Sequence, residues 1–330
     1  MSLIEIIKTK AKKDIKKIVL PEGEEARTIA AAKIIREEGL AVPILLGDPA
    51  KIDAEGIEII NPETSDKAAH YASELYELRK AKGVTEEDAA KLVKDPMYYG
   101  IMMVKLGDAD GLVSGAVHTT GDMLRPALQI IKTKKGSNLV SSSFILTRQK
   151  DGAEENIAMG DCAINLSYED TVDKEGNVVL TGARKLAEVA VETARTAAFF
   201  GIDPKVAVLS FSTYGSGKGG TVQLSHDAVA EARALDPSLV IDGEFQFDAA
   251  VSAEVAKTKC PDSKVAGQAN TFIFPLIEAG NIGYKIAQRL GGFEAYGPIL
   301  QGLNAPINDL SRGCTADEVY KMAIITAGMA

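Results

Sequence analysis

The chain has 330 residues, 46% of them apolar, and its 37 Lys and Arg against 46 Asp and Glu leave a net charge of −9. A chain of this length exceeds a usual single hydrophobic core and indicates two domains. The acidic balance argues against general binding to nucleic acid or to an anionic membrane, although clustered arginines can still bind an anionic substrate. No apolar run approaches the ~20 residues of a membrane span, and the first 17 residues lack the apolar core of a signal peptide.

The cysteines and histidines of the chain are few and scattered. Cys162, Cys260 and Cys314 lie far apart in the sequence, and none of them shows metal-ligand spacing with the three histidines. We therefore expect a protein of the reducing cytoplasm that has no disulfide framework and no metal site.

Short apolar runs typical of strands alternate along the chain with segments of helical periodicity. Strands are predicted at residues 17–20, 42–46, 111–113, 144–146, 206–209 and 271–274. Helices are predicted at residues 24–38, 66–81, 121–132, 181–200, 222–235, 249–256, 276–290 and 316–327. This alternation is typical of βαβ units, so the sequence predicts an α/β fold with mostly parallel sheets.

Two polar, turn-rich stretches interrupt the alternation, at residues 151–156 and 173–177. Their composition is typical of hairpin tips rather than of linkers. The boundary between the two domains is therefore predicted just before them, near residues 141–143.

Arg79 lies near the C-terminus of the predicted helix 66–81, beside Lys80 and Lys82. A cation at this position complements the helix dipole, and it can equally bind a phosphate group. The pattern alone favours neither interpretation.

Polar side chains follow the predicted strand 111–113, at the carboxyl end where ligands of open α/β sheets bind. The hydroxyls of Ser114, Thr119 and Thr120 are candidates for holding a phosphate. His118 is a candidate general base, but a single loop histidine is more often a structural hydrogen-bonding group. Arg125, at the next helix, is either a solvated helix residue or a ligand for the substrate.

A glycine-rich loop at residues 212–220 follows the predicted strand 206–209 and precedes a helix. Ser212, Gly215, Ser216 and Lys218 of this loop fit contact with a phosphate, because glycines allow close approach of the backbone. The frame of a nucleotide-binding P-loop is absent, since Gly219 follows the lysine. A plain glycine loop is the alternative.

The segment 306–318 carries the densest set of reactive side chains, with Ser311, Arg312, Asp317 and Glu318 close together. Thr315 and Glu318 have the spacing of a capping box, which predicts a helix start. A hydroxyl, a guanidinium and a carboxylate beside a helix N-terminus suit acyl or phosphoryl transfer. The alternative is that Glu318 only caps the helix and that Ser311 and Arg312 form a surface turn.

Cys314 adjoins Arg312 and the same helix N-terminus, and both would lower the pKa of its thiol. Free cysteines are more often small buried apolar residues, and this interpretation applies to Cys162 as well.

Seven stretches, taken together and in order, resemble the phosphate acetyltransferases. They are residues 110–118, 125–131, 161–165, 210–217, 242–246, 270–275 and 308–314, the last reading Asn-Asp-Leu-Ser-Arg-Gly-Cys. Each stretch alone is a weak signal, but the resemblance runs from residue 20 to the end of the chain. The phosphate butyryltransferases share much of the pattern.

The resemblance implies two α/β domains with mostly parallel sheets and an inter-domain cleft, as in the isocitrate and isopropylmalate dehydrogenases. The first domain would comprise residues 1–142 and 300–330, with residues 143–299 inserted as the second. It also implies a homodimer that acts on acetyl phosphate, coenzyme A, phosphate and acetyl-CoA. No cofactor is expected, because coenzyme A is a substrate.

The resemblance also assigns roles to the candidate residues. Arg312 would bind the carbonyl and phosphate oxygens, and Ser311 the reacting carbonyl or thiol. The expected substrate-binding residues are Arg79, Ser114, Thr119, Thr120, Arg125, Cys162, Ser212, Gly215, Ser216 and Lys218. The acyl group would pass directly to the thiolate of coenzyme A without an acyl-enzyme.

Two acids, Asp317 and Glu318, are candidates for the residue that removes the thiol proton. The family pattern has Glu followed by Asp, whereas this chain has Asp317 followed by Glu318. We favour Glu318, because position on the helix fixes the direction of a side chain. The alternatives to an acetyltransferase are a phosphate butyryltransferase and a non-catalytic module that senses acetyl-CoA.

Overall fold

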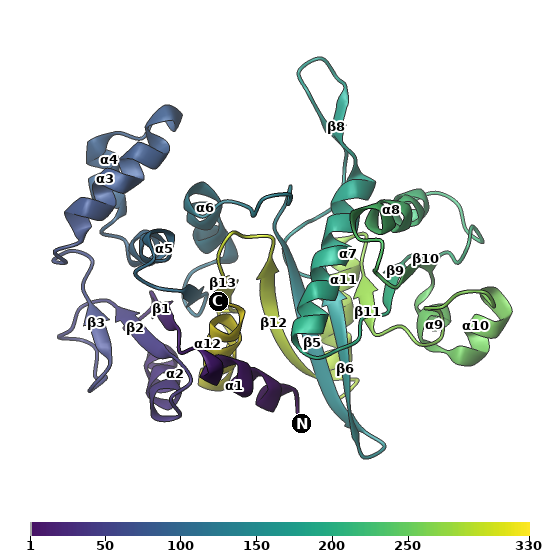
Figure 1. Ribbon diagram of the computed structural model, residues 1–330, viewed down its shortest axis with the longest axis horizontal. Coiled ribbons are helices and arrows are strands. Elements are labelled where there is room, and N and C mark those ends of the chain that lie inside the picture. Colours follow the sequence, from purple (N-terminus) through teal and green to yellow (C-terminus); the bar gives the residue numbers. More distant parts are fainter. Residues whose placement is uncertain (1) are drawn as a thin grey trace. The chain divides into compact units, whose positions relative to one another are not determined.

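The computed structural model describes residues 2–330, which form two compact α/β units (Figure 1). The first unit comprises Leu3–Lys135 and Leu303–Ala330. The second unit, Gly136–Gly302, is inserted between these two stretches.

The boundaries between the two units lie a few residues away from the positions expected from the sequence, 142/143 and 299/300. Both expected positions lie inside antiparallel partner strands of the second unit, β5 (Ser141–Lys150) and β12 (Glu294–Gln301). The backbone and side-chain amides of Asn138 also donate to Glu188 in the second unit, at 2.8 and 2.5 Å. The segment before β5 is therefore part of the second unit.

The first unit is built on a five-stranded sheet with the order β13-β4-β1-β2-β3, in which every pairing is parallel. Its strands are β1 (Lys17–Leu20), β2 (Val42–Leu46), β3 (Glu58–Ile60), β4 (Gly111–Ser114) and β13 (Ile307–Asp309). The carboxyl ends of parallel strands lie at the same edge of a sheet. The residues that follow β1, β4 and β13 therefore meet at one edge.

Helices cover both faces of this sheet (Figure 1). One face is covered by α1 (Leu3–Lys13), α2 (Ala26–Glu37) and α12 (Ala316–Met329). The other is covered by α5 (Pro96–Leu106) and α6 (Thr120–Ile130). Beside α5 and α6 lie α3 (Ala68–Arg79), the 3₁₀ turn Lys80–Lys82 and α4 (Glu86–Leu92).

The second unit is built on a six-stranded sheet with the order β10-β9-β11-β6-β5-β12. Its further strands are β6 (Ala153–Gly160), β9 (Val206–Leu209), β10 (Ile241–Phe245) and β11 (Thr271–Ile273). Only β5 runs antiparallel to its neighbours. A separate hairpin of β7 (Thr171–Val172) and β8 (Val178–Leu180) projects before α7 (Figure 1).

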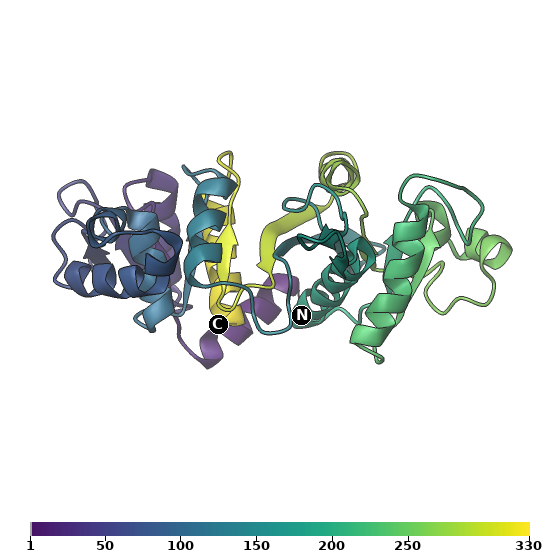
Figure 2. The same cartoon turned by 90° about the horizontal axis from the view of Figure 1, so that it is seen from above.

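Helices again cover both faces of the sheet. One face is covered by α7 (Gly182–Phe199) and α8 (Val222–Leu235), and the other by α9 (Phe247–Val251), α10 (Ala253–Lys259) and α11 (Ile277–Arg289). Figure 2 shows α7 (dark teal) and α11 (yellow-green) on opposite sides of the strands.

The predicted α/β fold with mostly parallel sheets is confirmed, and every predicted strand coincides with an observed one. Both predicted hairpin tips are also present, between β5 and β6 and between β7 and β8. The single helix predicted at 249–256 is wrong. The chain forms α9 and α10 instead, because the hydroxyl of Ser252 accepts a hydrogen bond from the backbone of Val255 and starts a new helix.

No helix within residues 2–330 combines the length and the apolar character that spanning a bilayer requires.

Candidate active site at the carboxyl edge of the first sheet

The loop between β4 and α6 is folded around the carboxylate of Glu22, which follows β1. The oxygens of Glu22 accept hydrogen bonds from the backbone N–H groups of Gly115, Ala116, Val117 and His118, at 3.1, 2.8, 2.9 and 2.8 Å. The ring Nδ1 of His118 lies 2.8 Å from the same carboxylate. Only 4% of the Glu22 side chain is exposed, so these bonds replace water.

These hydrogen bonds keep the buried carboxylate ionised. Burial by itself would raise the pKa of Glu22, but the bonds from His118, Val117 and Ala116 outweigh it and lower the pKa to about 2. The hydrogen bond to Glu22 in turn raises the pKa of His118, although burial acts in the opposite direction. The loop thus holds an internal anion on a row of backbone N–H groups.

Gly115 is the one position of this loop where only glycine fits. Its φ is +114°, and a Cβ there would lie 2.4 Å from the carbonyl oxygen of Leu310. The loop after β4 therefore lies directly against the loop after β13.

Arg27, in the first turn of α2, joins these two loops. Its Nη1 donates to the carbonyl oxygens of Arg312 and Cys314, at 2.9 and 2.8 Å. Its Nη2 donates to the carbonyl oxygen of Ala116 at 2.9 Å, and its Nε to Glu25 at 2.8 Å. Sequence reasoning missed Arg27. A signal was available, because a cation near a helix N-terminus opposes the dipole and needs another reason to be there.

Asp309, the last residue of β13, was also missed. It is 1% exposed, its Oδ2 accepts a hydrogen bond from the hydroxyl of Thr120, and its Oδ1 has no partner within residues 2–330. Burial raises the pKa of Asp309 to about 6, although Thr120 and the backbone of Leu310 act against the increase. Ser114 stands opposite Asp309 on β4, and its buried hydroxyl likewise lacks a partner among the described residues.

The predicted pair Ser311 and Arg312 lies on the exposed loop between β13 and α12. The turn is closed by the backbone N–H of Cys314, which donates to the carbonyl of Ser311 at 2.8 Å. The guanidinium of Arg312 has no hydrogen bond or ion pair with any residue that the structure describes, so it is available to a ligand.

The two predicted acids both have partners. Glu318 accepts from the backbone N–H of Thr315 at 2.7 Å and donates its own N–H to the Thr315 hydroxyl at 3.2 Å, which confirms the predicted capping box. Asp317 is 63% exposed and pairs with Lys321 at 2.7 Å. Neither carboxylate is fully buried, and only that of Glu318 is oriented by hydrogen bonds to the backbone.

The prediction that the Cys314 thiol has a lowered pKa is wrong. Burial raises its pKa, although the positive charge of Arg27, whose Nη1 lies 3.7 Å from Sγ, acts against the increase. The cation beside this thiol is Arg27, and the burial of Cys314 could not be read from its sequence neighbours.

Thr119 and Thr120 start α6, and both hydroxyls are engaged within the protein. Thr119 forms a capping box with Asp122, donating to its carboxylate at 2.7 Å and accepting from its N–H at 3.3 Å. Thr120 donates to Asp309.

The positive charges of two predicted substrate-binding arginines, Arg79 and Arg125, both influence the pKa of Tyr98. Arg79 ends α3 and Arg125 is exposed on α6, and the positive charges of both oppose the burial that raises the pKa of Tyr98. The Nε of Arg79 is buried and has no partner within the described range. Both cations therefore lie near Tyr98 of α5 in the first unit.

The glycine-rich loop of the second unit also makes hydrogen bonds to a buried glutamate, Glu244. The hydroxyl of Ser212 and the backbone N–H of Gly215 donate to Glu244, at 2.8 and 2.7 Å. The hydroxyl of Ser216 accepts from the backbone of Thr213 at 3.0 Å. Lys218 is exposed and unpaired in the described chain, so it is the member of the predicted set that is free to bind a ligand.

Cys162, predicted to bind substrate, is 0% exposed and lies in an apolar cluster of the second unit. Burial raises the pKa of its thiol well above the usual value. The structure therefore supports the alternative interpretation of Cys162 as a small buried apolar residue.

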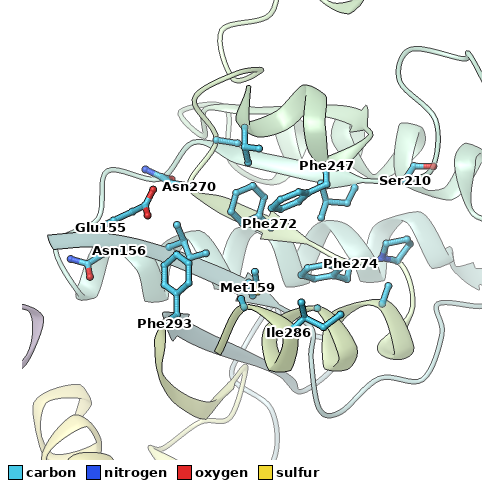
Figure 3. Close-up of a pocket in the computed structure, with 18 of the residues that line it drawn as sticks. Glu155, Asn156, Met159, Ser210, Phe247, Asn270, Phe272, Phe274, Ile286 and Phe293 are labelled. Atoms are coloured by element: carbon cyan, nitrogen blue, oxygen red, sulfur yellow. The ribbon is translucent and has the colours of Figure 1, made fainter. Parts of the chain in front are cut away.

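The second unit has a cavity of about 960 Å³ (Figure 3). None of the predicted site residues lines it. Aromatic rings of Phe247, Phe272, Phe274 and Phe293 line it, and Glu155 lies at its polar end. That carboxylate is paired with Arg148 at 2.5 Å and Lys150 at 3.2 Å. The cavity is apolar and its charges are neutralised, so it does not suit anionic substrates.

Residues 2–330 contain no group of three or more His, Cys, Asp or Glu side chains arranged to hold a metal ion.

Comparison with known proteins gives matches over nearly the whole chain. The family model described as phosphate acetyl/butaryl transferase matches residues 2–327. A phosphate acetyltransferase of Staphylococcus aureus is 48% identical and covers 99% of this chain and 98% of its own length. One of Thermoanaerobacterium thermosaccharolyticum is also 48% identical, with 99% of each chain covered.

Solved structures agree with these matches. A phosphotransacetylase from Streptococcus pyogenes superposes with a TM-score of 0.90 at 48% identity, covering 99% of this chain and 98% of its own. A branched-chain phosphotransacylase from Enterococcus faecalis has a TM-score of 0.66 at 17% identity, with 95% and 99% covered. This second likeness concerns the fold alone.

The Glu22 cluster leads to a prediction for stability. The pKa of Glu22 is lowered from 4.5 to about 2 on folding, so its charge stabilises the fold by about 3 kcal/mol at neutral pH. We expect Glu22→Gln to lower the free energy of unfolding by about this amount. Because folding lowers the pKa of Glu22, the difference in unfolding free energy between the two proteins is fully present above pH 4.5. It disappears as the pH falls through about 2. Urea unfolding across this pH range measures it.

Asp317→Asn is the matched control, because the exposed Asp317–Lys321 pair contributes less than about 1 kcal/mol. Equal unfolding free energies for Glu22→Gln and the unmodified chain at neutral pH would contradict the role of Glu22.

Proposed function

The chain belongs to the phosphate acetyl/butaryl transferase family, and from that premise we propose how its residues carry out the reaction. It is an acyltransferase that moves an acetyl group reversibly between acetyl phosphate and coenzyme A, giving acetyl-CoA and phosphate.

One observation carries the assignment of the site: the unpaired guanidinium of Arg312 at the carboxyl edge of the first sheet. Its backbone carbonyl is fixed by Arg27, so its loop is anchored while its side chain stays free. A guanidinium binds a phosphate or a developing oxyanion with two parallel hydrogen bonds. Arg312 would therefore hold acetyl phosphate and the oxyanion that forms from its carbonyl oxygen.

The reaction requires a thiolate, a stabilised tetrahedral oxyanion and a stabilised leaving phosphate. The thiolate of coenzyme A attacks the acetyl carbon, and the bond from that carbon to the phosphate oxygen then breaks. Arg312 neutralises the negative charge, and the Ser311 hydroxyl donates to the carbonyl oxygen.

Direct transfer is supported by the state of two cysteine thiols. Burial raises the pKa of both the Cys162 and the Cys314 thiol, which keeps them protonated. A protonated buried thiol is a poor nucleophile. No acyl-enzyme on either cysteine is needed or favoured.

Coenzyme A carries phosphate groups, and we assign Arg79 and Arg125 to bind them. The buried, partnerless Nε of Arg79 supports this assignment, because an unsatisfied donor of this kind gains most from an added acceptor. Lys218, exposed on the second unit, is proposed as a further phosphate contact.

The thiol proton was expected to pass to Glu318 or Asp317. Glu318 uses Oε2 to cap α12 and keeps Oε1 for such a role, whereas Asp317 pairs with Lys321. Glu318 is therefore the better placed of the two acids.

The proposal also includes a cytoplasmic location and a homodimer. The three unpaired cysteines fit a reducing cytoplasm. A homodimer would cover the apolar side chains exposed on α11, Ile282 and Ile286, and at the residue after it, Leu290. Light scattering that gives twice the mass of one chain would support it, and the mass of a single chain would contradict it.

We expect the purified chain to form thioesters fastest from acetyl phosphate. One methylene in an acyl pocket is worth ~1–3 kcal/mol, so propionyl and butyryl phosphate should react more slowly by ~10-fold or more. Thioester absorbance measures all three rates. A preference for butyryl phosphate would identify the butyryl enzyme, and no reaction with any donor would favour a sensing module.

The assignment of Arg312 predicts the effect of a charge-conserving change. Arg312→Lys keeps the charge but loses the planar pair of donors, so we expect kcat to fall by ~10²-fold or more. Arg195→Lys, on the exposed face of α7, is the control and should leave kcat unchanged. Near-normal turnover of Arg312→Lys would remove Arg312 from the mechanism.

The assignment of Arg79 predicts a selective effect on coenzyme A. Arg79→Ala should raise KM for coenzyme A by ~10-fold and leave KM for acetyl phosphate nearly unchanged, since one charged hydrogen bond is lost. The same variant should discriminate less against 3′-dephospho-coenzyme A. An equal rise of both KM values would show that Arg79 is structural.

A further inference from the structure

Asp309 is a carboxylate that the reaction described above does not use, although it lies two residues before Ser311. It ends β13 at the carboxyl edge of the first sheet and is 1% exposed. Its Oδ2 accepts a hydrogen bond from the hydroxyl of Thr120, the first residue of α6, and its Oδ1 has no partner within residues 2–330. This hydrogen bond joins the end of β13 to the start of α6, which packs beside it (Figure 1).

The charge of Asp309 is costly for a residue that only ties two elements together. A buried carboxylate with a partnerless oxygen loses hydration that nothing fully replaces. Burial accordingly raises the pKa of Asp309 to about 6, and the charge of Glu22 adds to the increase, while Thr120 and the backbone of Leu310 act against it.

The raised pKa has a consequence for stability at neutral pH. When folding raises the pKa of an acid, the folded state loses stability as the pH rises from the unfolded pKa through the folded one. An asparagine at position 309 would accept the hydrogen bond of Thr120 without this loss. The charge of Asp309 therefore indicates a requirement other than stability, as is common at functional sites.

The loop that follows Asp309 carries the two side chains assigned to the reacting group, Ser311 and Arg312. Its far end is held by Arg27, whose Nη1 donates to the carbonyl oxygen of Arg312 at 2.9 Å. Its near end is held by the hydrogen bond from Thr120 to Asp309. Hydrogen bonds to an ionised carboxylate are roughly twice as strong as neutral ones, so the charge makes this second anchor the firmer.

We infer that Asp309 is a positioning residue for acyl transfer: its charged hydrogen bond with Thr120 fixes the start of the Arg312 loop against α6. This inference rests on the proposed function. Arg312 must keep its productive position closely, because a misplacement of ~1 Å can lower the rate by ~10²-fold. Thr120, predicted from the sequence to hold a phosphate, acts on the reaction through Asp309 instead.

The first test removes the charge of Asp309 and keeps an acceptor for Thr120. We expect Asp309→Asn to lower kcat by ~10-fold or more and to change KM for either substrate little, because a positioning residue contacts neither substrate. The Tm at neutral pH should be unchanged or higher, because the buried charge is gone. A purely structural role would give the opposite pattern, a lower Tm with kcat retained.

A double-mutant cycle tests the hydrogen bond itself. Thr120→Val removes the donor and should lower kcat while KM for acetyl phosphate and for coenzyme A changes little. Adding Asp309→Asn to Thr120→Val should lower kcat no further, because the two side chains act through one bond. Thr120→Ser keeps the hydroxyl and should recover most of the turnover that Thr120→Val loses.

The matched control uses the residue before Asp309 on β13. Successive side chains of a strand point to opposite faces of the sheet. On the other face, the side-chain amide of Asn308 donates to the hydroxyl of Thr326 on α12 at 2.9 Å. Thr326→Val therefore also removes a hydroxyl that bonds β13 to a helix, and it should lower Tm while leaving kcat unchanged.

The inference is overturned if Asp309→Asn lowers kcat by less than about 10-fold, or if the losses of the two single variants multiply in the double variant. A higher KM for acetyl phosphate in Thr120→Val, with kcat retained, would also overturn it, because Thr120 would then bind the phosphate directly.

Equal losses of kcat in Thr326→Val and Thr120→Val would overturn the inference as well, because any loosening of β13 would then suffice. Unmodified protein that makes no acetyl-CoA would instead overturn the proposed function, and this inference with it.

Discussion

The candidate site depends on one buried anion, the carboxylate of Glu22. Removing a carboxylate from water is unfavourable unless hydrogen bonds replace its hydration. Here the loop after β4 supplies them by turning four successive N–H groups toward Glu22. The conformation of that loop therefore follows from the charge of a residue that follows another strand, β1. His118 and the start of α6 take their positions from it.

The second unit repeats this arrangement. Its loop after β9 has the serine and glycine content of a phosphate-binding loop, and so does the loop after β4. In both, a buried glutamate accepts the hydrogen bonds: Glu22 in the first unit and Glu244 in the second. The composition predicted contact with a phosphate, and the hydrogen bonds that these loops make in the structure go to glutamates of the protein itself. The sequence could not reveal these glutamate partners, because Glu22, for example, lies 93 residues before Gly115.

The limits of sequence reasoning lie where burial decides the outcome. Periodicity was enough for the α/β fold, but α5 was missed because it is apolar on nearly every side and shows no helical stripe. Asp309 and Arg27 were missed for a related reason, since their roles arise from partners distant in sequence. The pKa of Cys314 was predicted in the wrong direction from its neighbours in the chain, whereas burial determines it.

The distribution of partners among the cations reconciles a net charge of −9 with anionic substrates. Arg27 makes hydrogen bonds with all three of its guanidinium nitrogens, so its donors are already used in joining two loops. Arg312, on one of those loops, has no such bond within the described chain. A phosphate approaching this edge therefore competes with water alone for Arg312, but would have to break internal bonds to reach Arg27. Arg27 thus holds the loop of Arg312 in place, and this division lets Arg312 bind a ligand without loosening the site.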